Sequence, residues 1–149
     1  PRAKGEIAKE LMSRPMNIST KEEALERAMY LWGLIATKDS GASNEELRAR
    51  LAASYERSHY PAGPRRQLAA VIDTGDLRKN YTRKVSAPTL VIHGSEDPLA
   101  LPQGGVDIFR NINGAELEII EGMGHDIPKK FRARIAERII GHFQNGTPT

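Results

Sequence analysis

A short apolar run in the second half of the chain sets the strongest limits on its fold. It reads PTLVI over residues 88–92 and continues as HGSEDP over residues 93–98. A continuous run of this length, rich in β-branched residues and bounded by Pro and Gly, is typical of a strand buried on both faces of a parallel sheet. Such a strand needs neighbouring strands, so the fold depends on where those neighbours come from.

One further strand is predicted downstream. Residues 115–120, AELEII, alternate as a half-exposed edge strand does. A helix over residues 106–110 separates the two strands, and a tight GMGH turn follows the second one. Pro128 then opens a last helix. The apolar face of this helix is formed by Phe131, Ile135, Ile139 and Phe143. The order strand-helix-strand-helix predicts an α/β unit, although two strands alone make a poor sheet.

The first half of the chain is predicted to be helical. The tetrapeptides TKEE at residues 20–23 and SNEE at residues 43–46 have the spacing of a capping box, which marks a helix start. A third helix is predicted over residues 65–73, with Gly75 in a left-handed cap position. Residues 78–84 favour an amphipathic linker helix that leads into the first strand. Apolar residues recur at helical spacing after each capping box: Leu25, Ala28, Met29, Trp32 and Ile35, then Leu47, Leu51 and Tyr55.

Two chemically active side chains follow the two predicted strands. Asp97 comes just after the first strand and His125 just after the second. If the strands are adjacent and parallel, both side chains emerge at the same edge of the sheet, where ligands gather in open α/β sheets. A carboxylate bonded to one imidazole nitrogen fixes the tautomer of the ring and leaves the other nitrogen as a general base. The spacing therefore predicts an acid–base pair.

These residues also carry a resemblance to a known family. PTLVIHGSEDPL followed by AELEIIEGMGHDIP resembles the C-terminal part of α/β-hydrolase-fold enzymes, in which the acid of the catalytic triad follows an HG-x-x-D-P strand end and the His sits in a G-x-G-H turn. YPAGPRRQLAAVIDTGD is similar to the cap-to-core segment of the esterase branch that includes aclacinomycin methylesterase. The resemblance covers residues 45–145 well and implies that Asp97 is the acid and His125 the base.

The sequence departs from that family in one respect. No G-x-S-x-G nucleophile elbow occurs in the 149 residues, and the upstream segment that supplies part of the oxyanion hole is absent as well. We therefore expect a partial α/β-hydrolase fold, with a helical cap region over residues 1–80 and the C-terminal part of the core over residues 81–149. The N-terminal strands and the elbow are expected to be missing.

The resemblance implies a fragment of a serine hydrolase that acts on a small carboxylic ester, inactive in isolation and needing no cofactor or metal. One alternative is a non-catalytic fragment or binding module that self-associates, or pairs with a separate N-terminal half, through its exposed sheet edge. Another keeps the fold but changes the chemistry to that of a dehalogenase, an epoxide hydrolase or a carbon–carbon hydrolase, because the missing nucleophile could be Ser or Asp.

Composition restricts the other function classes. The chain has no Cys, and its four His residues show no metal-site spacing. The net charge is +3, but the Lys and Arg residues are scattered among Glu and Asp, which argues against a nucleic-acid partner. No apolar run approaches the length of a membrane span, and no signal peptide is visible, so we expect no membrane partner and a cytoplasmic location.

Several further residues have competing interpretations. Trp32 on a cap helix is a candidate for the substrate pocket, although apolar stripes at this spacing more often pack in a core. Asp126 and His93 are interpreted as structural. Ser86 and Ser95 lack an elbow context and are not favoured as nucleophiles.

Overall fold

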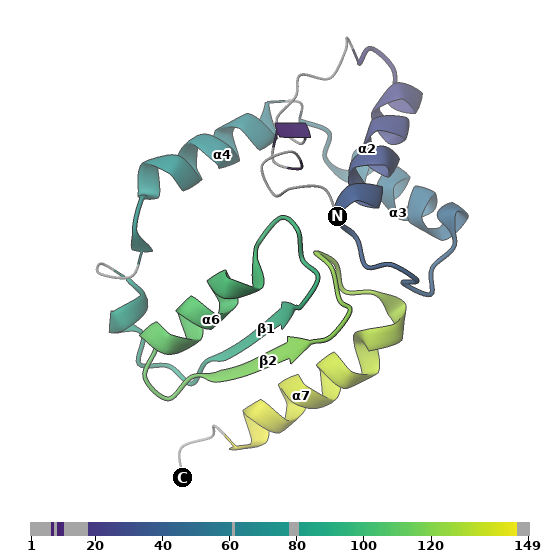
Figure 1. Cartoon of the computed structure of the whole chain (residues 1–149). Helices are drawn as coiled ribbons and strands as arrows, with labels where there is room; N and C mark the ends of the chain where they lie inside the picture. The colour runs from purple at the N-terminus through teal and green to yellow at the C-terminus, as the bar shows by residue number, and fades with distance from the viewer. Residues whose placement is uncertain (1–6, 8, 11–17, 61, 78–80, 146–149) are drawn as a thin grey trace.

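The computed structural model describes residues 7, 9–10, 18–60, 62–77 and 81–145. It has α/β architecture (Figure 1). The elements in chain order are the helices α2 (Lys21–Ile35), α3 (Asn44–Arg57) and α4 (Gly63–Thr74), the 3₁₀ turn η1 (Thr82–Lys84), the strand β1 (Leu90–Gly94), the helix α6 (Pro102–Asn111), the strand β2 (Glu116–Ile120), the 3₁₀ turn η2 (Lys129–Phe131) and the helix α7 (Arg132–Asn145).

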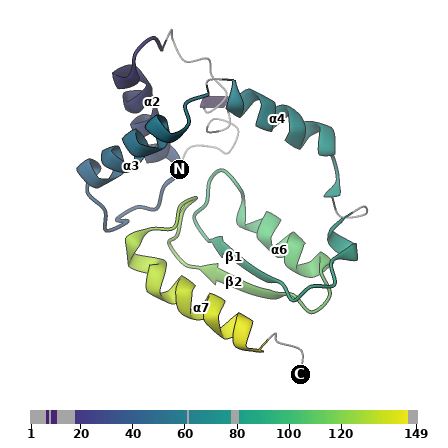
Figure 2. The same ribbon diagram turned by 180° about the vertical axis from the view of Figure 1, so that it is seen from behind.

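The two strands form the predicted parallel pair. Leu90 is in register with Glu116, and Gly94 is in register with Ile120. Helix α6 lies on one side of the strands and α7 on the other, as the two opposite views show (Figures 1 and 2). This arrangement confirms the strand-helix-strand-helix unit, and it brings the chain segments after β1 and β2 to the same edge of the sheet.

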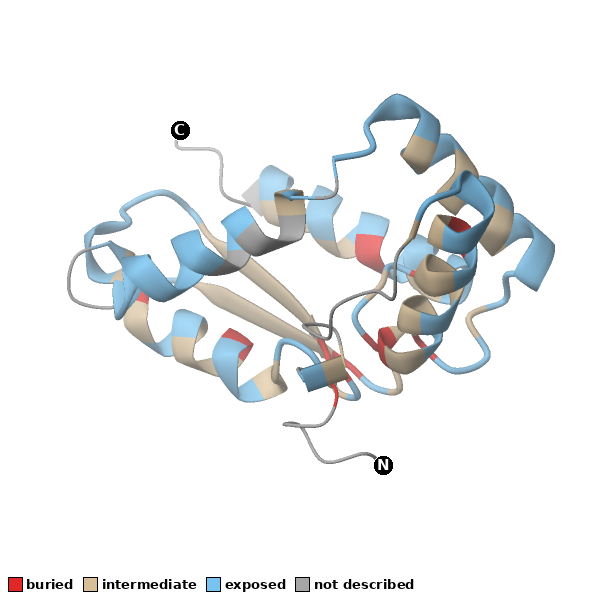
Figure 3. Cartoon of the chain, turned by 90° about the horizontal axis from the view of Figure 1, so that it is seen from above, coloured by how far each residue is buried: buried red, intermediate tan, exposed pale blue. Residues whose placement is uncertain are grey.

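The burial of the first strand differs from the prediction. Residues 90–93 of β1 are only partly buried, and only Gly94 is fully so (Figure 3). The reason is that β1 pairs with β2 alone among the described residues, so its other edge and parts of both faces stay open. The core is correspondingly small. Beside the strands it is a cluster of Ile120, Met123 and Ile135, with Ile92 and Phe131 packed against them. Other buried apolar residues among those described are Ile7, Leu25, Ile35 and Ile112.

The apolar face of α7 is covered only at its start. Ile135 is 7% exposed, but Phe143 at the far end is 73% exposed, and Ile139 and Ile140 are also exposed. The two strands and the small core therefore cover only part of the apolar surface of α7, within the described part of the chain.

Both predicted capping boxes are present. Thr20 accepts a hydrogen bond from the amide of Glu23, and Ser43 does the same for Glu46. Each glutamate reaches back to the amide of its cap residue. The amides of Ser19 and Thr20 hold the pKa of Glu23 below its ordinary value, and the amide of Ser43 does the same for the pKa of Glu46. The two helices pack as a pair and are joined by ion pairs from Arg48.

Some boundaries differ from the sequence prediction. Helix α4 starts two residues earlier, at Gly63, because Pro64 can occupy its first turn. Gly75 has a positive φ of 62° but a ψ of −140°, so it is not in the left-handed helical conformation. In place of the expected linker helix the structure has the three-residue 3₁₀ turn η1, and residues 78–80 lie outside the described residues.

Candidate active site

The loops after β1 and β2 are tied together by backbone hydrogen bonds. The amide of Ser95 donates to the carbonyl of Ile120 at 3.0 Å, and the amide of Glu96 donates to that of Met123 at 2.9 Å. In the reverse direction, the amide of Gly122 donates to the hydroxyl oxygen of Ser95 at 2.9 Å. Ser95 is therefore a structural residue of this junction, consistent with its not being favoured as a nucleophile.

The two loops approach so closely that only glycine fits between them. A Cβ atom on Gly94 would lie 2.2 Å from the carbonyl oxygen of Met123 and 2.6 Å from that of Gly124. The turn itself also uses glycine, because Gly122 has a φ of +72°. The HG and GMG sequences thus allow the end of one strand to lie directly against the turn after the other.

Asp97 is held firmly at this junction. It is 7% exposed, and its Oδ1 atom accepts hydrogen bonds from the backbone amides of Leu99 and Ala100, both at 2.9 Å. Its Oδ2 atom lies 2.8 Å from Nδ1 of His125. Because an ionised carboxylate can only accept, Nδ1 carries the proton of this bond. The structure therefore brings the two predicted site residues together.

His125 is fixed from both sides but keeps one nitrogen available. Its backbone amide donates to the carbonyl of Ile35 at 2.8 Å, and Asp97 holds Nδ1. The side chain is 37% exposed, and none of the described residues bonds to Nε2. An imidazole with Nδ1–H bonded to a carboxylate presents a basic Nε2, which is the arrangement of a general base.

The other polar residues of this region have structural contacts. Nε2 of His93 lies 2.7 Å from the carbonyl of Ala100, and the ring packs against Gly105, where a Cβ would come within 2.8 Å of Nδ1. The carboxylate of Asp126 faces Thr37 instead of His125. Glu96 is exposed. These positions agree with the structural interpretation of His93 and Asp126.

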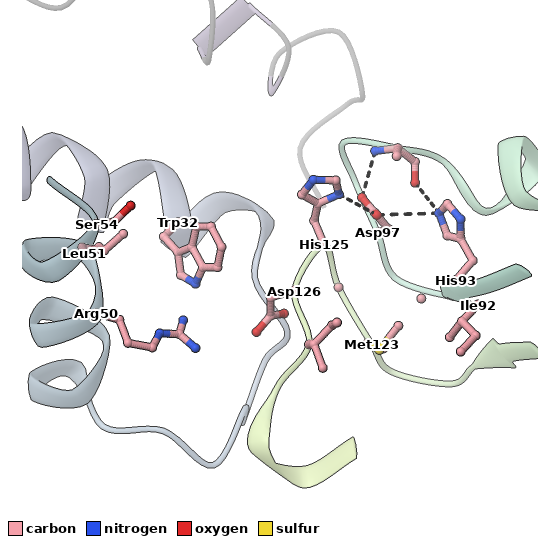
Figure 4. A pocket seen from close by; sticks show the side chains of 14 residues that line it. Trp32, Arg50, Leu51, Ser54, Ile92, His93, Asp97, Met123, His125 and Asp126 are labelled. Atoms are coloured by element: carbon pink, nitrogen blue, oxygen red, sulfur yellow. Dashed lines mark hydrogen bonds and ion pairs between the residues drawn. The ribbon is translucent and has the colours of Figure 1, made fainter. Parts of the chain in front are cut away.

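A cavity of about 680 Å³ opens in front of His125. Figure 4 shows Asp97 and His125 on one side of it, with Trp32 of α2 and Arg50 of α3 on the other. The guanidinium of Arg50 lies 5.8 Å from the centre of the Trp32 ring. Trp32 therefore lines the same cavity as the acid–base pair, whereas Arg50 is a lining residue that the sequence pattern did not single out.

The described residues contain no cluster of three or more His, Cys, Asp or Glu side chains that could hold a metal ion. In the same part of the chain, no helix has both the length and the apolar character needed to span a bilayer.

Comparison with solved structures places this geometry in a known fold. A meta-cleavage product hydrolase from Pseudomonas fluorescens IP01, solved as a serine-to-alanine mutant complexed with acetates, superimposes with a TM-score of 0.61 at 20% identity, over 95% of this chain and 51% of that chain. Est816, described as an N-acyl homoserine lactone degrading enzyme, gives a TM-score of 0.53 at 22% identity, over 89% of this chain and 53% of that chain. The chain has part of the α/β-hydrolase fold. No protein-family model matches the sequence.

The extent of the match agrees with the expected partial fold. This α/β-hydrolase-fold chain spans about half the length of the two solved structures it matches, while nearly all of it is used in the superposition. The likeness to hydrolases thus extends over the helical region and over the two strands whose ends carry Asp97 and His125.

Proposed function

We propose that this chain supplies the acid and the base of a Ser-Asp-His triad in a carboxylic ester hydrolase. The observation that carries the proposal is the 2.8 Å contact between Oδ2 of the buried Asp97 and Nδ1 of His125, at the edge of a cavity. Asp97 orients the ring and stabilises its protonated form, and His125 is the general base.

The chemistry follows from this geometry. Nε2 of His125 removes the proton of a serine hydroxyl as that oxygen attacks the ester carbonyl carbon. The resulting imidazolium then gives the proton to the departing alcohol, which leaves an acyl-enzyme. A water molecule, deprotonated by the same Nε2, attacks the acyl group. The bond to the serine oxygen breaks, the imidazolium returns the proton to that oxygen, and the carboxylic acid is released. Asp97 stays ionised throughout and keeps Nδ1–H directed at its Oδ2 atom.

The nucleophile comes from outside the 149 residues. The sequence contains no G-x-S-x-G elbow, and loss of a nucleophile removes most of the rate of such an enzyme. The open edge of β1 offers a place for a further strand, because its backbone groups are paired on one side only among the described residues. We propose that a polypeptide segment bearing the elbow docks there.

The names of the structural neighbours support this class of reaction. One is a hydrolase, and the other degrades an N-acyl homoserine lactone, which is a cyclic ester. The presence of Trp32 in the cavity wall supports a cap role for α2 and α3, with the indole facing the acyl or alcohol part of the substrate.

The test uses the completed hydrolase, meaning a longer polypeptide that carries a nucleophile elbow upstream of residue 1. It is expected to hydrolyse a short-chain p-nitrophenyl ester, whereas the 149-residue chain alone is expected to give no turnover above background. An upstream coding sequence without an elbow, or a completed hydrolase that leaves short-chain esters intact, would contradict the proposal.

Trp32→Ala in the completed hydrolase tests the cavity wall. Loss of the indole is expected to raise KM on the order of tenfold and to change kcat less, because a wall binds the ground state and the transition state alike. The control is Tyr30→Ala, which removes a 44% exposed aromatic ring from the same helix outside the cavity lining. Equal KM values for the two variants would show that Trp32 does not contact the substrate.

A further inference from the structure

The turn that carries His125 is bound along its length to the end of helix α2. Gly124 donates its amide to the hydroxyl oxygen of Thr37 at 2.8 Å, and His125 donates its amide to the carbonyl of Ile35 at 2.8 Å. Oδ1 of Asp126 accepts from both the amide and the hydroxyl of Thr37, each at 2.6 Å. We call these five residues the clasp.

Thr37 is the central member of the clasp. Its hydroxyl accepts from Gly124 and donates to Asp126, so it uses the donor and one acceptor position of the group. The residue is 6% exposed, and water cannot readily replace these bonds once the hydroxyl is removed. The packing is also tight, since a Cβ on Gly124 would lie 2.7 Å from the carbonyl oxygen of Ile35.

The clasp and Asp97 constrain His125 at two independent points. The clasp fixes the backbone of residues 124–126, and Asp97 fixes Nδ1 of the ring. With both ends held, Nε2 has a defined direction toward the cavity. Trp32 lies one helical turn before Ile35 on the same helix, so the clasp also sets the distance between the cavity wall and the base.

We propose that Thr37, acting with Asp126, is a positioning residue that holds His125 in its pairing with Asp97 and couples the end of α2 to the base. This inference rests on the proposed function. Thr37 lies outside the cavity lining, so its contribution is the orientation of the imidazole. Asp126, next to His125 in the sequence, thus binds Thr37 and helps to fix the backbone of the turn. Asp97, 28 residues away, binds the imidazole ring.

The experiment uses NMR on the 149-residue chain with Thr37→Val, which keeps the side-chain shape and removes the hydroxyl. Amide exchange of Gly124 and His125 is expected to accelerate on the order of tenfold. The hydrogen-bonded Nδ1 proton of His125, assigned by its loss in His125→Gln, is expected to broaden or disappear. Thr37→Ser is expected to restore both signals. Thr74→Val, which removes an exposed helical hydroxyl from α4, is the matched control and is expected to change neither.

If Thr37 has a purely structural role, Thr37→Val accelerates the amide exchange of Gly124 and His125 but leaves the Nδ1 proton of His125 in place. That result would overturn the proposal. Unchanged exchange would overturn it as well. Should Thr37→Val fail to fold by circular dichroism, Asp126→Asn carries the same test, with smaller expected effects in the same direction. If the wild-type chain shows no Nδ1 proton signal, it is the Asp97–His125 pair itself, and with it the proposed function, that fails. In the completed hydrolase, Thr37→Val is expected to lower kcat more than it raises KM.

Discussion

Asp97→Asn in the completed hydrolase is expected to lower kcat by about 10⁴-fold, with a small effect on KM. The reason lies in the hydrogen bonds of the carboxylate. Oδ1 of Asp97 accepts hydrogen bonds from the amides of Leu99 and Ala100. Because only an acceptor can pair with these two donors, the side-chain oxygen of an asparagine has to occupy the Oδ1 position. The NH₂ group would then face Nδ1 of His125 as a donor and force the ring into the tautomer with its proton on Nε2. That tautomer cannot accept a proton from a nucleophile.

The matched control for this variant is Glu96→Gln. Glu96 is the adjacent carboxylate, but it is exposed and lies outside the cavity lining. The kcat of the Glu96→Gln variant is expected to stay within about twofold of wild type, because substitutions of exposed residues outside the core and the active site have small effects. Steady-state hydrolysis of a p-nitrophenyl ester measures both variants. An unaffected Asp97→Asn enzyme, or equal losses in the two variants, would exclude Asp97 as the acid.

Gly94→Ala is expected to destabilise the 149-residue chain by about 3 kcal/mol. The added Cβ would lie 2.2 Å from the carbonyl oxygen of Met123, and that atom belongs to the backbone, so no side-chain rotation relieves the clash. The loop carrying Asp97 and the turn carrying His125 have to separate. Urea denaturation followed by the fluorescence of Trp32, the only tryptophan of the chain, measures the loss.

Gly104→Ala is the control for the glycine substitution. It lies inside α6, and a Cβ there meets no atom within 4 Å, so the change is expected to be neutral or to stabilise by up to about 1 kcal/mol. Equal denaturation midpoints for wild type and Gly94→Ala would show that the two loops do not approach as closely as described.

The contact between Asp97 and His125 could be predicted from sequence because it depends on local signals. Each strand is marked by its own apolar run, Asp97 and His125 follow shortly after the strands, and parallel pairing brings the two strand ends to one edge. The capping boxes at Thr20 and Ser43 are likewise local, and both are present as predicted.

The features that could not be predicted depend on contacts between distant segments. The bond between Gly124 and Thr37 joins residues 87 positions apart, and a threonine after a helix carries no local sign of such a partner. The partial burial of β1 was missed for a related reason. Its apolar sequence suits a strand covered on both faces, whereas the described chain provides only one neighbouring strand.

Labelling with a fluorophosphonate, followed by intact-mass and peptide analysis, tests whether His125 serves a nucleophile from outside the 149 residues. No covalent adduct is expected on the 149-residue chain, including Ser86 and Ser95. One adduct per molecule of the completed hydrolase is expected, on the serine of the nucleophile elbow, with slower labelling when His125 is replaced by Gln. A stoichiometric adduct on the 149-residue chain, or labelling of the completed hydrolase that does not depend on His125, would contradict the proposed function.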